Sequence, residues 1–197
     1  MSTLTNAQKH IEELVAGLRG DDDFMPFLIT NHDGAEGYFG LAAMAKDTKD
    51  DIADLMAAAM AVTRAQEAVF AAVSWVVIQD DATLNVMPSE HPDRKEAVFL
   101  VHVTRDGDTM HTARLHRIDR KVALGAWEEM DGAKMAGRFA DALRAGMHLG
   151  TKMPDTFQQW CQERIDAGEI GDALRPAMSA FRKFRMGEMP DGDDSDA

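Results

Sequence analysis

The dipeptide Asp106-Gly107 is the feature of this sequence that most constrains its fold. It lies between two runs rich in β-forming residues, 96–104 and 109–118. Asp-Gly favours the tight hairpin turn in which both central residues have positive φ. The sequence therefore predicts an antiparallel hairpin, and the fold must contain a sheet.

Three further segments predict strands of that sheet. Residues 24–30 form the first, and Pro26, which cannot donate a ladder hydrogen bond, predicts an edge strand or the entry to one. Residues 38–44 return from a turn at 31–34, which completes a first hairpin. Residues 122–127 form a short strand after the second hairpin.

The apolar run Val69–Gln79 has two interpretations. Its β-branched and aromatic residues are typical of a strand buried on both faces. The same run could also continue the helix that precedes it, because periodicity does not separate the two in a short apolar segment. We favour the strand.

Helices are predicted from apolar residues at helical spacing and from capping patterns. Thr5 and Gln8 form a capping box at the first helix, which Gly20 ends. The predicted helices are residues 5–20, 48–66, 133–148, 154–167 and 172–186.

These elements predict an α+β fold, with a mixed or antiparallel sheet of about five strands and helices packed on it. Residues 1–150 form the α+β domain. Residues 151–186 form a C-terminal helical hairpin that packs on it, with a hinge at 146–154. Residues 187–197 hold five acidic residues, two glycines and one proline, which predicts a disordered acidic tail.

Composition narrows the class of protein. Thirty-four acidic residues stand against 21 basic ones, for a formal net charge of -13, which disfavours direct binding to nucleic acid. The longest apolar run is too short to cross a bilayer, and no signal peptide is recognisable. With a single cysteine, Cys161, these features predict a cytoplasmic protein that does not associate with membranes.

Two histidines of the predicted hairpin are candidate metal ligands. A two-residue loop at Asp106-Gly107 would place His102 directly opposite His111, with Cβ atoms about 5 Å apart. Zinc requires at least three protein ligands, and no third ligand is evident nearby. The alternative is a pair of half-exposed histidines without a metal.

The loop before this hairpin contains candidate catalytic residues. His91, Asp93 and Arg94 bring an imidazole, a carboxylate and a guanidinium together, as general acid–base catalysis needs. The alternative is a solvated loop stiffened by proline. The sequence contains no dinucleotide-binding, P-loop, esterase or metalloprotease motif, so we predict no cofactor.

The C-terminal helices contain candidate partner-binding residues. Aromatic side chains lie beside a small basic cluster, a combination that suits the docking of a partner helix. The alternative is that the cations complement the helix dipole. The candidates are Trp160, Phe181, Arg182, Phe184 and Arg185.

The sequence alone favours a non-enzymatic interaction or assembly protein that binds another protein or a second copy of itself. One alternative is a small enzyme, with or without a metal. Another is an acidic inhibitor that mimics nucleic acid, which would place its carboxylates on one face. Whether the chain is an enzyme is left open, and the absence of a defensible catalytic set weighs against it.

Overall fold

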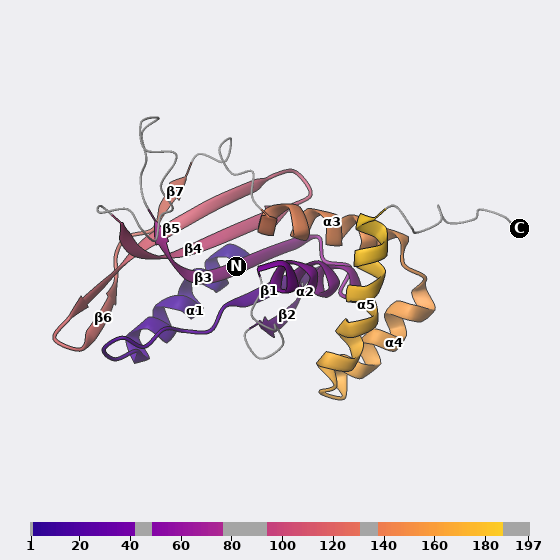
Figure 1. Ribbon diagram of the computed structural model, residues 1–197, viewed down its shortest axis with the longest axis horizontal. Coiled ribbons are helices and arrows are strands. Elements are labelled where there is room, and N and C mark those ends of the chain that lie inside the picture. Colours follow the sequence, from indigo (N-terminus) through magenta and orange to yellow (C-terminus); the bar gives the residue numbers. More distant parts are fainter. Residues whose placement is uncertain (1, 42–48, 77–93, 131–137, 187–197) are drawn as a thin grey trace, which may run out of the picture.

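The computed structural model describes residues 2–41, 49–76, 94–130 and 138–186 (Figure 1). In this part of the chain, five helices and a seven-stranded antiparallel sheet form an α+β fold, as predicted. The helices are α1 (Thr3–Gly17), α2 (Lys49–Val62), α3 (Arg138–Lys152), α4 (Asp155–Asp166) and α5 (Ile170–Arg185). The strands are β1 (Phe27–His32), β2 (Ala35–Gly40), β3 (Glu67–Val76), β4 (Lys95–Thr104), β5 (Asp108–Ile118), β6 (Lys121–Leu124) and β7 (Glu128–Met130).

The strand order is β2-β1-β3-β4-β5-β6, and β7 pairs with β5. The first hairpin is confirmed, with positive φ at both Asp33 and Gly34 of its two-residue turn. The prediction of an edge strand at Pro26 is wrong, because β1 begins at Phe27 and lies between β2 and β3. Pro26 precedes the strand, where its missing N–H removes nothing from the ladder.

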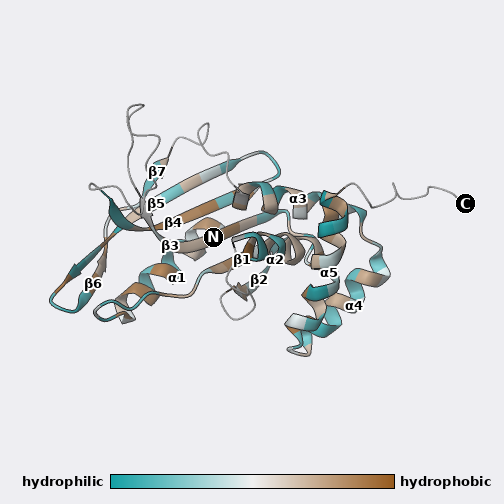
Figure 2. Cartoon of the chain, in the orientation of Figure 1, coloured by the Kyte–Doolittle hydropathy of each residue, from teal (hydrophilic) through white to brown (hydrophobic). Residues whose placement is uncertain are grey.

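β3 is a strand and not a continuation of α2, so the favoured interpretation of the apolar run is confirmed up to Val76. Val69 and Ala71 face one side of the sheet, and Ala68 and Phe70 face the other. All four are buried. Burial on both faces explains why residues 68–73 of this strand are all apolar (Figure 2).

Different helices cover the two faces of the sheet. On one face, Ile11 and Val15 of α1 pack with Phe27 and Leu100. On the other face, α2 to α5 form the larger core with residues such as Phe70. The C-terminal helices therefore pack against the α+β body, in agreement with the predicted fold class.

α2 is buried all round rather than along one stripe. Every residue from Ala53 to Val62 is less than a tenth exposed, because the sheet lies on one side and α3 and α5 lie on the other. α3 comes close enough that a Cβ at Gly146 would lie 2.4 Å from the carbonyl oxygen of Ala57. Gly146 thus permits contact between two helix backbones, and α3 continues to Lys152 through most of the predicted hinge segment 146–154.

Arg117 of β5 ties the segment after α1 to the sheet. Its guanidinium donates to both carboxylate oxygens of Glu96, at 2.7 and 2.8 Å. It also donates to the carbonyls of Gly20 and Asp22 and to the carboxylate of Asp23. Hydrogen bonds to Glu96, together with Asp23, raise the pKa of Arg117 above its ordinary value.

The N-terminal helix begins two residues earlier than predicted. The Ser2 hydroxyl accepts a hydrogen bond from the backbone N–H of Thr5, so Ser2 is the N-cap. Thr5 therefore lies inside α1, and Gly20 lies beyond its end. Among the described residues, no helix has the length and apolar character needed to cross a membrane. The predicted acidic tail lies outside the described residues.

Candidate functional site

The β4–β5 hairpin has a different register from the one predicted. His102 lies opposite Thr109, and His111 lies opposite Leu100. The loop is longer than two residues, because the Thr104 hydroxyl accepts hydrogen bonds from the backbone N–H groups of Asp106 and Gly107. A shift of two residues preserves the face, so the two histidines still lie on the same side of the sheet.

These histidines belong to a chain of hydrogen bonds on the α1 side of the sheet. His102 Nε2 lies 2.9 Å from Glu67 Oε1, and the Thr109 hydroxyl lies 3.1 Å from His111 Nε2. Glu67 also accepts a hydrogen bond from Thr3 of α1. We call this chain the α1-face network; its members are Thr3, Asn31, Glu67, His102, Thr109 and His111.

His111 is the most buried titratable group of this network, with 8% of its surface exposed. Burial lowers the pKa of His111 below its ordinary value of 6.5. Glu129 of β7 acts in the opposite direction, and the neighbouring His102 lowers the pKa further. The network therefore favours a neutral imidazole at this position.

The network arranges Glu67, His102 and Thr109 as a carboxylate, an imidazole and a hydroxyl in series. A carboxylate only accepts, so His102 donates Nε2–H to Glu67, and a neutral ring faces Thr109 with Nδ1. The Thr109 hydroxyl lies 3.5 Å from that nitrogen, a loose version of a base facing a nucleophile. Within the described residues, no group of three or more His, Cys, Asp or Glu side chains could hold a metal ion.

Of the three predicted catalytic residues, only Arg94 lies within the described residues. His91 and Asp93 lie outside the described residues. Arg94 is exposed immediately before β4. Whether these three side chains meet is therefore not tested, and their catalytic role stays a prediction.

Two of the predicted partner-binding cations contact α2 of the same chain. Arg182 Nε donates to Asp54 Oδ2 at 2.5 Å, and Arg185 lies 3.4 Å from Asp54 Oδ1. Asp54 is 2% exposed, so these cations offset a buried negative charge. Sequence reasoning missed Asp54, although a carboxylate between the apolar residues of a predicted core helix is an available signal.

The predicted aromatic residues have different environments. Phe181 is 3% exposed and lies in the larger core. Phe184 is partly buried, with its ring centroid 5.7 Å from that of His148. Trp160 is 37% exposed on α4, stacked beside Phe157. Among these three, Trp160 offers the largest exposed aromatic surface.

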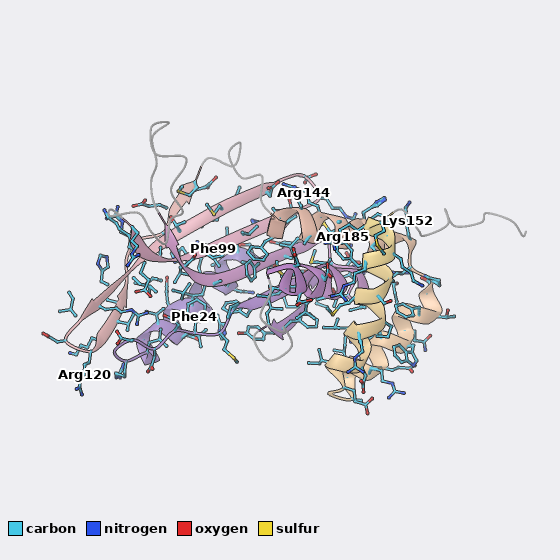
Figure 3. All side chains as sticks on the ribbon, viewed as in Figure 1. Phe24, Phe99, Arg120, Arg144, Lys152 and Arg185 are labelled. Atoms are coloured by element: carbon cyan, nitrogen blue, oxygen red, sulfur yellow. The ribbon has the colours of Figure 1, made fainter. Side chains whose placement is uncertain are left out.

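Sequence reasoning also missed a pocket at the end of the sheet where the β4–β5 turn meets α3. Its basic lining comes from four segments that are distant in sequence, and Figure 3 shows one of these residues, Arg144, beside the hairpin tip. The pocket has a volume of about 490 Å³. We call it the arginine pocket; its lining residues include His32, Arg64, Arg105, Asp106, Arg144 and His148.

Comparisons of the chain with protein-family models, with curated proteins and with solved structures find no significant match. A fold class by itself does not define a function. A functional proposal for this protein therefore depends on the side chains and surfaces described above.

Proposed function

We propose that this chain is a non-enzymatic assembly protein that acts through protein–protein contacts. The docking surface is the outer edge of β2, and its occupant is a second copy of the chain. The observation that carries the proposal is that β2, in the described part of the chain, pairs with β1 alone. An unpaired strand edge is a ready template for another strand.

The register identifies which backbone groups of β2 are available. Ala35 pairs with His32 across a two-residue turn, and Leu41 donates to the carbonyl of Pro26. Odd-numbered residues of β2 thus bond to β1 by strand alternation. Glu36, Tyr38 and Gly40 direct their N–H and C=O groups outward, away from the sheet.

The sequence of β2 lacks the devices that usually protect an edge. It contains no lysine and no proline, and its single charged residue is Glu36. Tyr38 is 50% exposed, and its ring stacks on Phe27 with centroids 5.2 Å apart. A fixed, exposed aromatic ring is a good anchor for an interface because little entropy is lost when it is covered.

In a pairing of two copies at this edge, the paired strands place no like charges opposite each other. If two β2 strands pair antiparallel about a two-fold axis at Tyr38, the two tyrosines lie opposite each other. Each Glu36 then lies opposite Gly40 of the other copy. Like charges do not face each other, and every outward N–H meets a carbonyl.

Sedimentation equilibrium of the full chain tests this proposal. We expect a reversible dimer that Gly40→Glu weakens by roughly threefold to tenfold, because the new carboxylate faces Glu36 of the other copy. Gly40→Lys is the matched control, since it alters the same backbone position and faces Glu36 with the opposite charge. A Cβ at Gly40 meets no atom of the described residues within 4 Å, so both variants should fold. A monomeric wild-type protein, or equal weakening by both variants, would contradict the proposal.

A second candidate function is a small hydrolytic enzyme, favoured by the Glu67, His102 and Thr109 series. Thr109→Val removes the hydroxyl while nearly preserving side-chain shape. If the protein hydrolyses simple aryl esters and this variant abolishes turnover while remaining folded, the enzyme becomes the better proposal. An ester panel without turnover would remove this candidate.

The acidic-inhibitor alternative receives little support from the charge distribution. Carboxylates from α2, α3, β4 and β5 bind arginines of the same chain, as in the pairs of Glu96 with Arg117 and Asp54 with Arg182. A phosphate mimic needs carboxylates that remain available to a basic partner.

A further inference from the structure

We propose that the arginine pocket binds a small organic phosphate, with Arg105 as the principal phosphate-binding side chain. This site lies on a different part of the molecule from the β2 edge and does not depend on the assembly proposal. The ligand class follows from three properties of the pocket: its charge, its apolar surface and the fixed positions of its walls.

The charge of the lining opposes that of the whole protein. Arg64, Arg105 and Arg144 line the pocket together with one carboxylate, from Asp106, in a chain whose net charge is -13. Guanidinium groups match the oxygens of a phosphate with parallel N–H donors. A phosphate that contacts several such groups is selected over a neutral molecule of the same shape.

Arg105 has the free guanidinium of the three. Within the described chain, no hydrogen bond or ion pair engages its side chain, and it is exposed in the β4–β5 turn. Arg144 contacts Asp108 and Asp141, and Arg64 contacts Asp155. These contacts use only part of each five-donor fork, so N–H groups remain for a ligand.

The positions of the other two arginines are fixed by the fold. Arg64 has a left-handed φ of 49° at the end of α2, a conformation that costs a non-glycine residue free energy. Its carbonyl accepts a hydrogen bond from His32 Nδ1 at 2.8 Å, which holds the imidazole in the pocket wall. Arg144 lies on α3, which the contact between Gly146 and Ala57 holds against α2. Preorganised walls reduce the entropy lost on binding.

The remaining lining suits an organic body attached to the phosphate. Ala65, Met147 and Gly150 contribute apolar surface, and the volume of about 490 Å³ is typical of small-molecule sites. A second pocket of about 340 Å³ shares His32 and Arg64 and contains Gln158. Gln158 is 7% exposed, and its Oε1 has no hydrogen-bond partner among the described residues, so a ligand N–H or O–H could satisfy it.

Isothermal titration calorimetry of the full chain at low ionic strength tests the site, with phenyl phosphate, inorganic phosphate, benzoate and phenol as probes. We expect saturable binding of one phenyl phosphate per chain. Inorganic phosphate should bind more weakly because it lacks the apolar body, and benzoate should bind more weakly because it carries less charge. Phenol should not bind.

The decisive variant is Arg105→Gln, which should weaken phenyl phosphate binding by about tenfold or more, as expected for a charge-assisted contact. Arg120→Gln is the matched control, because Arg120 is an exposed arginine in the β5–β6 turn at the far end of the sheet (Figure 3). It should leave the affinity unchanged. Equal losses in both variants would indicate a general charge effect, and tighter binding of benzoate would overturn the phosphate assignment. Undetectable binding of phenyl phosphate at millimolar concentration would overturn the site itself.

Discussion

Both faces of the sheet are covered by apolar packing, but the helices on the two faces differ in their additional contacts. On the α2 side, helices meet through small residues, and Gly146 brings the α3 backbone against Ala57. On the α1 side, one end of the helix is attached through the hydrogen bonds of the α1-face network, beginning with Thr3 and Glu67. Close packing depends on volume, whereas this network depends on protonation and on donor geometry. The two faces should therefore respond to different perturbations.

Gly146→Ala should produce the largest effect, because it introduces a methyl group into the contact between two helix backbones. The new Cβ would lie 2.4 Å from the carbonyl oxygen of Ala57 and 2.7 Å from its Cα. We expect a loss of about 3 kcal/mol in the free energy of unfolding, measured by urea denaturation.

Gly17→Ala is the control for this substitution. Gly17 is also helical, at the end of α1, and a Cβ there meets no atom within 4 Å in the part of the chain that the structure describes. Its stability should be unchanged or slightly raised by the better helix propensity of alanine. Similar losses of stability at both positions would show that the close approach of α3 to α2 does not cause the effect of Gly146→Ala.

Arg182→Met should produce the next largest effect, because it removes the hydrogen-bonded partner of the buried Asp54. We expect a loss of about 2 kcal/mol, less than for a fully buried pair, because Arg182 is half-exposed and Arg185 remains within 3.4 Å of the same carboxylate. Arg175→Met, on the exposed side of α5, should change stability by less than about 0.5 kcal/mol. Equal losses of stability in the two variants would show that the ion pair with Asp54 does not hold α5 against α2.

Ser2→Ala tests the N-terminal cap of α1, the helix on the opposite face of the sheet. It removes the side-chain acceptor of the Thr5 N–H, a contact of 3.2 Å. We expect a loss of about 1 kcal/mol, as is usual for an N-cap. Ser2→Asp should retain stability, since aspartate also caps helices. A loss in the aspartate variant as large as in the alanine variant would exclude capping as the cause.

His111→Gln should have the smallest effect at neutral pH and a distinct effect in acid. Burial lowers the pKa of His111 below 6.5, so the folded protein binds fewer protons here than the unfolded chain. This contribution to stability is complete above about pH 6.5 and is lost as the pH falls through the folded-state pKa. Denaturation midpoints from pH 8 to 5 should decline less steeply for the variant. Parallel profiles would assign the acid sensitivity to other groups.

The elements of the fold were largely predictable, whereas the exact register was not. Asp106-Gly107 identified the hairpin, but the Thr104 side chain binds two turn N–H groups and extends the loop. The Thr104 side chain and the backbone of the strands compete for the same turn N–H groups. The outcome depends on the three-dimensional position of that side chain, which the Asp-Gly dipeptide does not specify. The first hairpin has a two-residue loop at Asp33-Gly34, which is shorter than the predicted turn at 31–34.

The candidate sites were less predictable because they assemble residues that are distant in sequence. His102 and His111 could be placed on one face by strand alternation, but Glu67 and Thr3, which complete their network, come from other elements. The arginine pocket combines the ends of β1 and α2 with a turn and a helix. The spacing of residues within any one segment of the sequence does not indicate that these four segments meet.

The contacts of Arg117 have a consequence for how α1 detaches in acid. They attach the segment that follows the C-terminal end of this helix, through a cation that stays charged at every pH of interest. The N-terminal end is attached through Glu67, which also bonds the histidine beside His111. Protonation of His111 would add a positive charge to the network that attaches the N-terminal end of α1. Mild acid is therefore expected to open the helix in one direction, from Thr3 toward Gly17, while its far end stays anchored.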